Sequence, residues 1–147
     1  EHRARLLILG EGPERASLEA QASRLGVAGD VRLDGFAENP FAYMRKAAVF
    51  ALTSDFEGMP NALLEAMASG LPTITTPVAD NEELIEQRRT GMLFDVDSVQ
   101  ELACALKELV PHPRRSQQYG MYARERVLRG YTWRGAAERY VATGFLP

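Results

Sequence analysis

The sequence predicts an α/β protein built on a Rossmann-like parallel sheet with helices on both faces. Short apolar runs alternate along the chain with longer stretches of helical periodicity, which is the pattern of this class. The runs are mostly hydrophobic rather than alternating, as expected for parallel strands that are buried on both faces. A hydrophobic content of 46% with 25% charged residues is typical of a globular domain of 147 residues.

The apolar runs mark five predicted strands. Each is only a few residues long, as is common for strands of a buried parallel sheet. The predicted strands cover residues 5–9, 31–34, 49–52, 73–75 and 92–94.

The intervals between the strands are predicted to be helices. The best marked helix begins at Ser98, because Glu101 follows three residues later and the pair forms a capping box. Pro111 and Pro113 end this helix, since proline cannot continue it. The predicted helices cover residues 14–25, 41–47, 98–109, 114–128 and 133–143.

Charge and cysteine content restrict the function classes. A net charge of -3 argues against a general nucleic-acid-binding protein. The single cysteine, Cys104, lies between two alanines in a helical pattern, so we expect a small buried core residue and no disulfide within the chain. With no signal peptide and no long apolar run, a cytoplasmic protein is expected. Arginines of residues 114–139 could also bind the inner membrane face, although interspersed glutamates favour a solvated helix face.

Residues 54–70, SDFEGMPNALLEAMASG, carry the strongest chemical signal. Glu57 and Glu65 flank a glycine-proline turn that opens onto a helix. The first N–H groups of a helix have no partner within it, and its positive dipole end favours an anion, so a phosphate can bind there. Gly58 would allow the backbone to approach a ligand closely.

Glu65 stands among apolar neighbours, including Leu64 and Met67, so its carboxylate needs partners to offset desolvation. A carboxylate can accept two hydrogen bonds side by side, which suits the two hydroxyls of a ribose. The alternative is an exposed helix glutamate that pairs with a nearby arginine.

The run from Ser54 to Pro72 resembles the E-x7-E signature of family 4 retaining glycosyltransferases, in the C-terminal, donor-binding half of a GT-B fold. Residues 7–14, 31–36, 75–85 and 90–94 resemble further motifs of that family in the same order. Two features depart from the pattern. Ala79 replaces a common glycine, and the Arg and Lys that clamp phosphate in the family belong to a segment upstream of the first residue here.

The resemblance implies the C-terminal half of a GT-B enzyme that lacks its first strand. Residues 1–147 would form a single nucleotide-sugar-binding domain, with 113–147 as C-terminal helices. The whole enzyme would transfer a hexose-type sugar, with retention, to a carbohydrate or lipid-linked acceptor held by the N-terminal domain. This fragment alone is expected to be inactive. Without the first strand, residues 6–9 lose a neighbour, so we expect direct pairing across the gap, strand exchange or self-association.

The resemblance also implies residue roles. Glu57 would be the catalytic residue that contacts hydroxyls of the transferred sugar, and Glu65 would contact the ribose. Backbone N–H groups of the turn would face the phosphates and sugar, except that of Pro60, which has none. Gly35 and Phe36 would meet the base. The implied donor-binding residues are Gly12, Gly35, Phe36, Glu57, Gly58, Met59, Pro60, Asn61 and Glu65.

No metal or other cofactor is expected. Asp95 and Asp97 spell the D-x-D of metal-dependent glycosyltransferases, but they precede the capping Ser98 and are better explained by a loop-and-cap role. Two alternatives to a transferase remain. One is a non-catalytic nucleotide-sugar-binding module, and the other is a sugar-nucleotide epimerase of GT-B fold, against which the presence of only two histidines argues.

Overall fold

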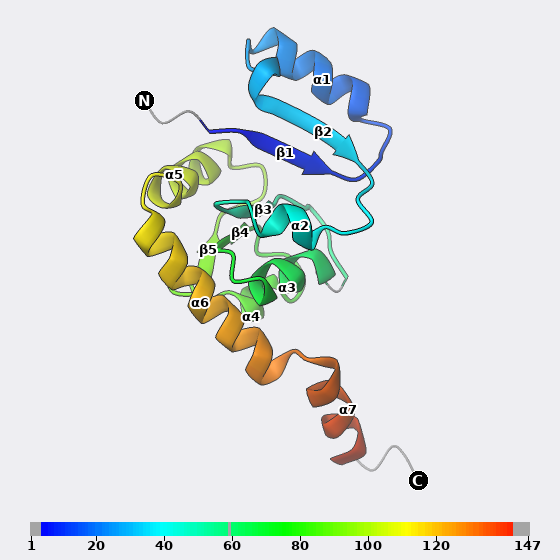
Figure 1. Ribbon diagram of the computed structural model, residues 1–147, viewed down its shortest axis with the longest axis vertical. Coiled ribbons are helices and arrows are strands. Elements are labelled where there is room, and N and C mark those ends of the chain that lie inside the picture. Colours follow the sequence, from blue (N-terminus) through cyan, green and yellow to red (C-terminus); the bar gives the residue numbers. More distant parts are fainter. Residues whose placement is uncertain (1–3, 59, 143–147) are drawn as a thin grey trace. The chain divides into compact units, whose positions relative to one another are not determined.

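The computed structural model describes residues 4–58 and 60–142 (Figure 1). The chain divides into two compact units, Glu1–Ala42 and Tyr43–Pro147. Each unit is described in turn.

The first unit is a parallel strand pair joined by a helix. Leu6 lies opposite Val31 in the ladder, and the register shifts between Ile8 and Leu9. Just past the strands, the N–H of Gly10 donates to the carbonyl of Gly35 at 2.7 Å, which holds their carboxyl ends together. The unit contains β1 (Leu6–Leu9), α1 (Arg15–Arg24), the 3₁₀ helix η1 (Ala28–Asp30) and β2 (Val31–Gly35).

Helix α1 ends where the sequence predicts. Gly26 has a φ of 71°, a left-handed conformation that glycine adopts without steric cost, and its N–H donates to the carbonyl of Ser23. The guanidinium of Arg15 joins α1 to the strands by donating to the carbonyl of Leu33 at 2.7 Å. Of the residues in α1, only Ala22 is buried.

The second unit is built on a three-stranded parallel sheet in the order β3-β4-β5 (Figure 1). In the central strand β4, Thr73 pairs with Phe50 on one side and Gly91 on the other. All three residues of β4 are buried. The elements are β3 (Phe50–Leu52), α3 (Asn61–Ala68), β4 (Thr73–Thr75), α4 (Asn81–Leu84), β5 (Gly91–Leu93), α5 (Val99–Leu109), α6 (Pro113–Gly130) and α7 (Trp133–Ala142). The short helix α2 (Phe41–Met44) spans the division between the units.

Two apolar clusters cover this sheet, and α6 contributes to both. The side chains of a strand alternate between its faces, so Ile74 points opposite to Thr73 and Thr75. The first cluster consists of Leu63, Met67, Leu84, Ile85, Ala123 and Val127. The second consists of Ile74, Met92, Phe94, Ala105, Leu109 and Tyr119. The predicted α/β class with a parallel sheet and helices on both faces is confirmed.

The predicted elements are confirmed with small shifts at their ends, and residues 73–75 match β4 to the residue. Direct pairing of strands across the gap would join the two units and stays a prediction. Among the described residues, β1 pairs only with β2, and β3 pairs only with β4. Strand exchange with a second copy stays a prediction.

The prediction of a buried Cys104 is also wrong, because its side chain is exposed on α5. The buried side of α5 is formed by Ala105 and Leu109, which lie four residues apart on one face of the helix. A turn of about 100° per residue carries Cys104 off that face. Because Cys104 has an alanine on each side, the local sequence shows no apolar periodicity from which its exposure could be predicted.

Helix α6 crosses the turn after α3 at a very close approach. A Cβ atom on Gly120 would overlap the carbonyl oxygen of Gly70 and would lie 2.7 Å from its carbonyl carbon. Two arginines of α6 hold the neighbouring helices. Arg124 donates to the carbonyl of Ala68, at the C-terminal end of α3, at 2.6 Å. The half-buried Arg126 pairs with Glu86 at 2.5 Å, so part of this basic helix is packed rather than solvated.

Candidate functional site

The two acids of the sequence motif lie on either side of the start of α3. Glu57 belongs to the loop between β3 and α3, and Glu65 is the fifth residue of α3. Both side chains are half-buried. Strand β3 ends at Leu52, so this loop leaves the carboxyl end of the sheet, which is where open parallel sheets bind ligands.

The start of α3 carries no side-chain cap. Its N-cap residue is Pro60, which makes no capping hydrogen bond. The first bond of the helix runs from the N–H of Leu64 to the carbonyl of Pro60 at 3.1 Å. The N–H groups of Asn61, Ala62 and Leu63 therefore have no acceptor inside the helix, and the positive end of its dipole lies at the same place.

Glu65 does not fit the alternative of an exposed glutamate paired with arginine. Its side chain is half-buried, and among residues 4–58 and 60–142 it forms neither an ion pair nor a hydrogen bond. Glu86, one example of a glutamate that does pair, binds both Arg89 and Arg126. The Glu65 carboxylate is thus left with its acceptor capacity unused.

Glu57 is held by a neighbouring hydroxyl. The Oγ of Ser54 donates to Oε1 of Glu57 at 2.6 Å, the short distance expected of a charge-assisted bond. The backbone of Ser54 is held in turn, because Oγ1 of Thr76 donates to its carbonyl at 2.6 Å. This second bond joins the end of β4 to the loop after β3.

Behind these contacts lies a buried amide. The side chain of Asn81, at the start of α4, is fully buried. Its Nδ2 donates to Oγ1 of Thr75 and to the carbonyl of Thr76, both at 2.9 Å. Its Oδ1 is buried and accepts no hydrogen bond from the described residues. A chain of hydrogen bonds therefore runs from α4 to the Glu57 carboxylate.

The loop between β4 and α4 carries a strained residue. Ala79 has a φ of 47°, which is the left-handed region that favours glycine. This is the position at which the sequence departs from the glycine of the family pattern.

We expect Ala79→Gly to raise the free energy of unfolding by roughly 0.5–1 kcal/mol, because glycine adopts a positive φ without the clash of a Cβ atom. Urea unfolding of the full-length protein measures this. Ala20→Gly, at an exposed position inside α1, is the control and should lower the free energy by about 1 kcal/mol. A loss of stability in both variants would contradict the left-handed conformation of Ala79.

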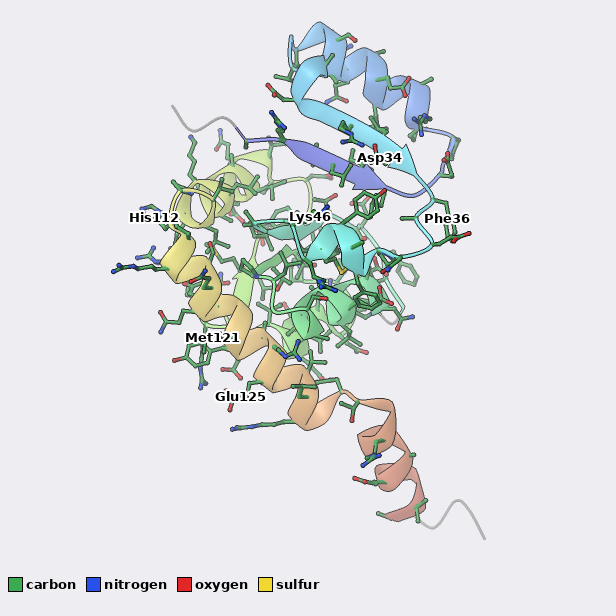
Figure 2. All side chains as sticks on the ribbon, in the orientation of Figure 1. Asp34, Phe36, Lys46, His112, Met121 and Glu125 are labelled. Carbon is green, nitrogen blue, oxygen red and sulfur yellow. The ribbon has the colours of Figure 1, made fainter. Side chains whose placement is uncertain are left out.

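The remaining predicted site residues belong to the first unit. Gly35 ends β2 with a φ of 74°, the left-handed region that favours glycine. Phe36 follows it with 78% of its surface exposed (Figure 2). Gly12 lies in the turn after β1 and has open space around its Cα atom.

The predicted site residues thus fall into two groups. Glu57, Gly58, Pro60, Asn61 and Glu65 come together in one loop-and-helix segment of the second unit. Gly12, Gly35 and Phe36, near the strand ends of the first unit, form the other group. Met59 lies outside the described residues.

The hollows of the second unit do not coincide with the acids. One of about 480 Å³ lies on the surface of α6, where Met121 and Glu125 stand (Figure 2). A smaller one of about 90 Å³ is lined by residues including Glu86 and Arg89. Neither Glu57 nor Glu65 lines them. The paired acids therefore lie outside both of these hollows.

The D-x-D sequence takes the loop-and-cap role that was predicted. The N–H of Asp95 donates to the Glu101 carboxylate at 2.8 Å, and Oγ of Ser98 accepts from the N–H of Glu101. Within the described parts of the chain, no three His, Cys, Asp or Glu side chains gather in a way that could hold a metal ion. No described helix is both long and apolar enough to cross a bilayer.

The sequence did not reveal Ser54, Thr76 and Asn81 as connected residues. The partners in these bonds lie between 3 and 22 positions apart along the chain, and the bonds form only where the ends of β3 and β4 meet. The structure shows that the fully buried strand β4 is polar at both ends and is followed by a buried asparagine, burial that the sequence alone does not report.

Curated proteins resemble this chain over most of its length. The lipopolysaccharide core biosynthesis glycosyltransferase LpsE of Rhizobium meliloti is 30% identical over 71% of this chain and 31% of its own. A GDP-mannose-dependent alpha-(1-6)-phosphatidylinositol monomannoside mannosyltransferase of Mycolicibacterium smegmatis is 32% identical over 91% of this chain and 37% of its own. The chain thus spans about a third of the length of these relatives.

Solved structures share the fold. HepE from Anabaena, solved with UDP, superposes with a TM-score of 0.87 at 21% identity, over 97% of this chain and 41% of that one. The C-terminal domain of a group 1 family glycosyl transferase, LpcC of Francisella tularensis, gives 0.80 at 24% identity, over 88% of this chain and 70% of that one.

The GT-B assignment rests on these structures together with a family match. The model of the family described as Glycosyl transferases group 1 matches residues 1–112, which include the loop of Glu57 and the whole of α3. Homologues of the chain are named as glycosyltransferases. The chain belongs to the Glycosyl transferases group 1 family and has the fold of the C-terminal domain of a GT-B glycosyltransferase.

Proposed function

We propose that this chain is the donor-binding domain of a family 4 retaining glycosyltransferase and binds a nucleotide-diphosphate sugar at the start of α3. The observation that carries the proposal is Glu65, a half-buried carboxylate without an ionic partner among the described residues, on a helix whose first turn is uncapped. An acceptor for hydroxyls and a set of N–H donors for an anion thus lie on one helix.

Glu65 would bind the ribose, because its two oxygens can accept hydrogen bonds from neighbouring hydroxyls. The N–H groups of Asn61 and Ala62 would bind the diphosphate. With a rise of 1.5 Å per residue, Asn61 and Glu65 are separated by about 6 Å along the helix axis. This short separation along the helix suits two ligand groups that are covalently joined, such as ribose and phosphate.

Glu57 would act on the transferred sugar. Its Oε1 already accepts from Ser54, whereas Oε2 accepts no hydrogen bond from the described residues and would accept from a sugar hydroxyl. We assign Glu57 electrostatic support of the oxocarbenium-like transition state and positioning of the sugar. In the first unit, the backbone at Gly35 and the exposed Phe36 would contact the base, with Gly12 nearby.

The rest of the enzyme would supply the acceptor site and the other wall of the donor site. The length of the relatives, of which this chain spans about a third, supports this. The acceptor would be a carbohydrate or a lipid-linked sugar, and transfer would need no metal. The base is not predicted, because the mannosyltransferase relative is named for GDP-mannose whereas HepE was solved with UDP-glucose.

The test is a thermal-shift panel on the full-length protein with UDP-, GDP- and ADP-sugars, followed by an assay of sugar transfer and donor hydrolysis. At one hundred times its Kd, a ligand stabilises the native state by about 2.7 kcal/mol, which raises Tm by several degrees. We expect one base to give this shift and to support turnover. A protein that responds to none would contradict the proposal, and binding without turnover would favour the non-catalytic module.

A further inference from the structure

The hydrogen bonds behind Glu57 form a continuous path through three elements. We propose that Asn81 and Thr76 are positioning residues that set the orientation of the Glu57 carboxylate through Ser54. The inference deepens the proposed function and rests on it for its consequence for catalysis, whereas the path itself is a property of the protein without ligand.

The first step of the path fixes the carboxylate. Ser54 donates a single hydrogen bond to Oε1 of Glu57, and the two residues are only three positions apart in one loop. A loop without regular backbone bonds does not orient a side chain by itself. The direction in which Oε2 faces is therefore set by where Ser54 stands.

The second step fixes Ser54. Its carbonyl accepts from Oγ1 of Thr76, a residue that is 1% exposed and directly follows β4. The backbone supports the same junction, because the N–H of Thr76 donates to the carbonyl of Leu52 at 3.3 Å. The loop that carries Glu57 is thus attached to the most buried strand of the sheet.

The third step fixes Thr76. Both bonds from Nδ2 of Asn81 end on β4 or on the residue after it, so the amide joins the start of α4 to the strand end. The same side chain holds a buried Oδ1 without a partner among the described residues. A leucine would fill the space without that unpaired oxygen, so packing alone does not explain an asparagine here.

The same strand offers a matched control. Thr73 is as buried as Thr76, but its hydroxyl finds no partner among the described residues, and it stands at the opposite end of β4 from the acids. Thr→Val removes a hydroxyl at nearly constant volume in both cases. Only Thr76→Val breaks the path.

Hydrogen exchange tests the path without any ligand. In the full-length protein, we expect Thr76→Val and Asn81→Asp to increase amide exchange at least tenfold in the junction segment at residue 76, whose N–H donates to the carbonyl of Leu52, because the junction of β3 and β4 loses its side-chain bonds. Asn81→Asp replaces the donating amide by oxygens that only accept. Thr73→Val should leave exchange in this segment unchanged. Unchanged exchange in Thr76→Val would overturn the inference, whether or not the protein binds a nucleotide.

Kinetics then test the consequence for catalysis. The probes are UDP, GDP and ADP for binding and their glucose conjugates for turnover. We expect Thr76→Val to lower kcat roughly 10- to 100-fold, with the Kd of the nucleoside diphosphate within threefold of wild type. Thr76→Ser keeps the hydroxyl and should restore most of kcat, and Thr73→Val should match wild type.

These results separate the inference from the proposed function. Equal losses of kcat and nucleotide affinity in Thr76→Val and Thr73→Val would indicate general destabilisation and overturn the positioning role. A Thr76→Ser variant as slow as Thr76→Val would overturn it too. If the proposed function is wrong, the wild-type protein itself will bind and turn over none of the probes. The hydrogen-exchange comparison of Thr76→Val with Thr73→Val still tests the path in that case, because it uses no ligand.

Discussion

Glu65→Ala in the full-length enzyme is expected to weaken nucleoside diphosphate binding by at least 100-fold, to below the range of a calorimetric titration. Hydrogen bonds to a charged group contribute about 1.5–3 kcal/mol each, and the carboxylate is proposed to accept two from the ribose. The fold should survive, because the side chain of Glu65 forms neither an ion pair nor a hydrogen bond within the described structure.

Two further variants complete this experiment. Glu65→Gln keeps the shape and one acceptor oxygen, so its affinity should fall between those of wild type and Glu65→Ala. Glu82→Ala removes an exposed glutamate from α4 and should bind as wild type does. Wild-type affinity in Glu65→Ala would refute the ribose assignment, although the family membership of the chain would stand.

Gly120→Ala is expected to cost about 3 kcal/mol of stability, the upper range for overpacking a buried site. The new Cβ would overlap the carbonyl oxygen of Gly70 and lie 2.7 Å from its carbonyl carbon. Both are backbone atoms, so no side chain can rotate away to make room. The only relief is to move α6 off the turn after α3, which opens the first apolar cluster.

Whether Gly→Ala lowers or raises the free energy of unfolding distinguishes a close contact from open space. In an open helix, Gly→Ala stabilises by up to about 1 kcal/mol. Gly130→Ala in the last position of α6 is the matched control, since a Cβ there meets no atom within 4 Å. Urea unfolding of the full-length protein should therefore give a lower free energy of unfolding for Gly120→Ala and a higher one for Gly130→Ala. Gly120→Ala as stable as Gly130→Ala would contradict the close approach.

Sequence patterns predicted the elements of the second unit well where burial is continuous. Residues 73–75 were predicted to the residue because a strand buried on both faces needs no particular periodicity to stand out. The loop from Glu57 to the start of α3 could be predicted as well, since a glycine-proline turn before an apolar helical run marks the beginning of a helix.

Contacts between distant segments could not be predicted in this way. Gly120 is an ordinary helix glycine until α6 is placed against Gly70, fifty positions earlier. Asn81 likewise gives no local sign that its amide reaches back to Thr76 and, through it, to Ser54. Local patterns report which face of an element is apolar, whereas these contacts depend on which elements meet.

The hollow on α6 has a practical consequence for ligand discovery. It lies along one face of a single helix, beside Met121 and Leu128, whose side chains are 72% and 56% exposed. Compounds that settle there should not compete with a nucleotide, because Glu57 and Glu65 do not border that surface. Compounds directed at the proposed donor site are better sought by competition with a nucleoside diphosphate on the full-length protein.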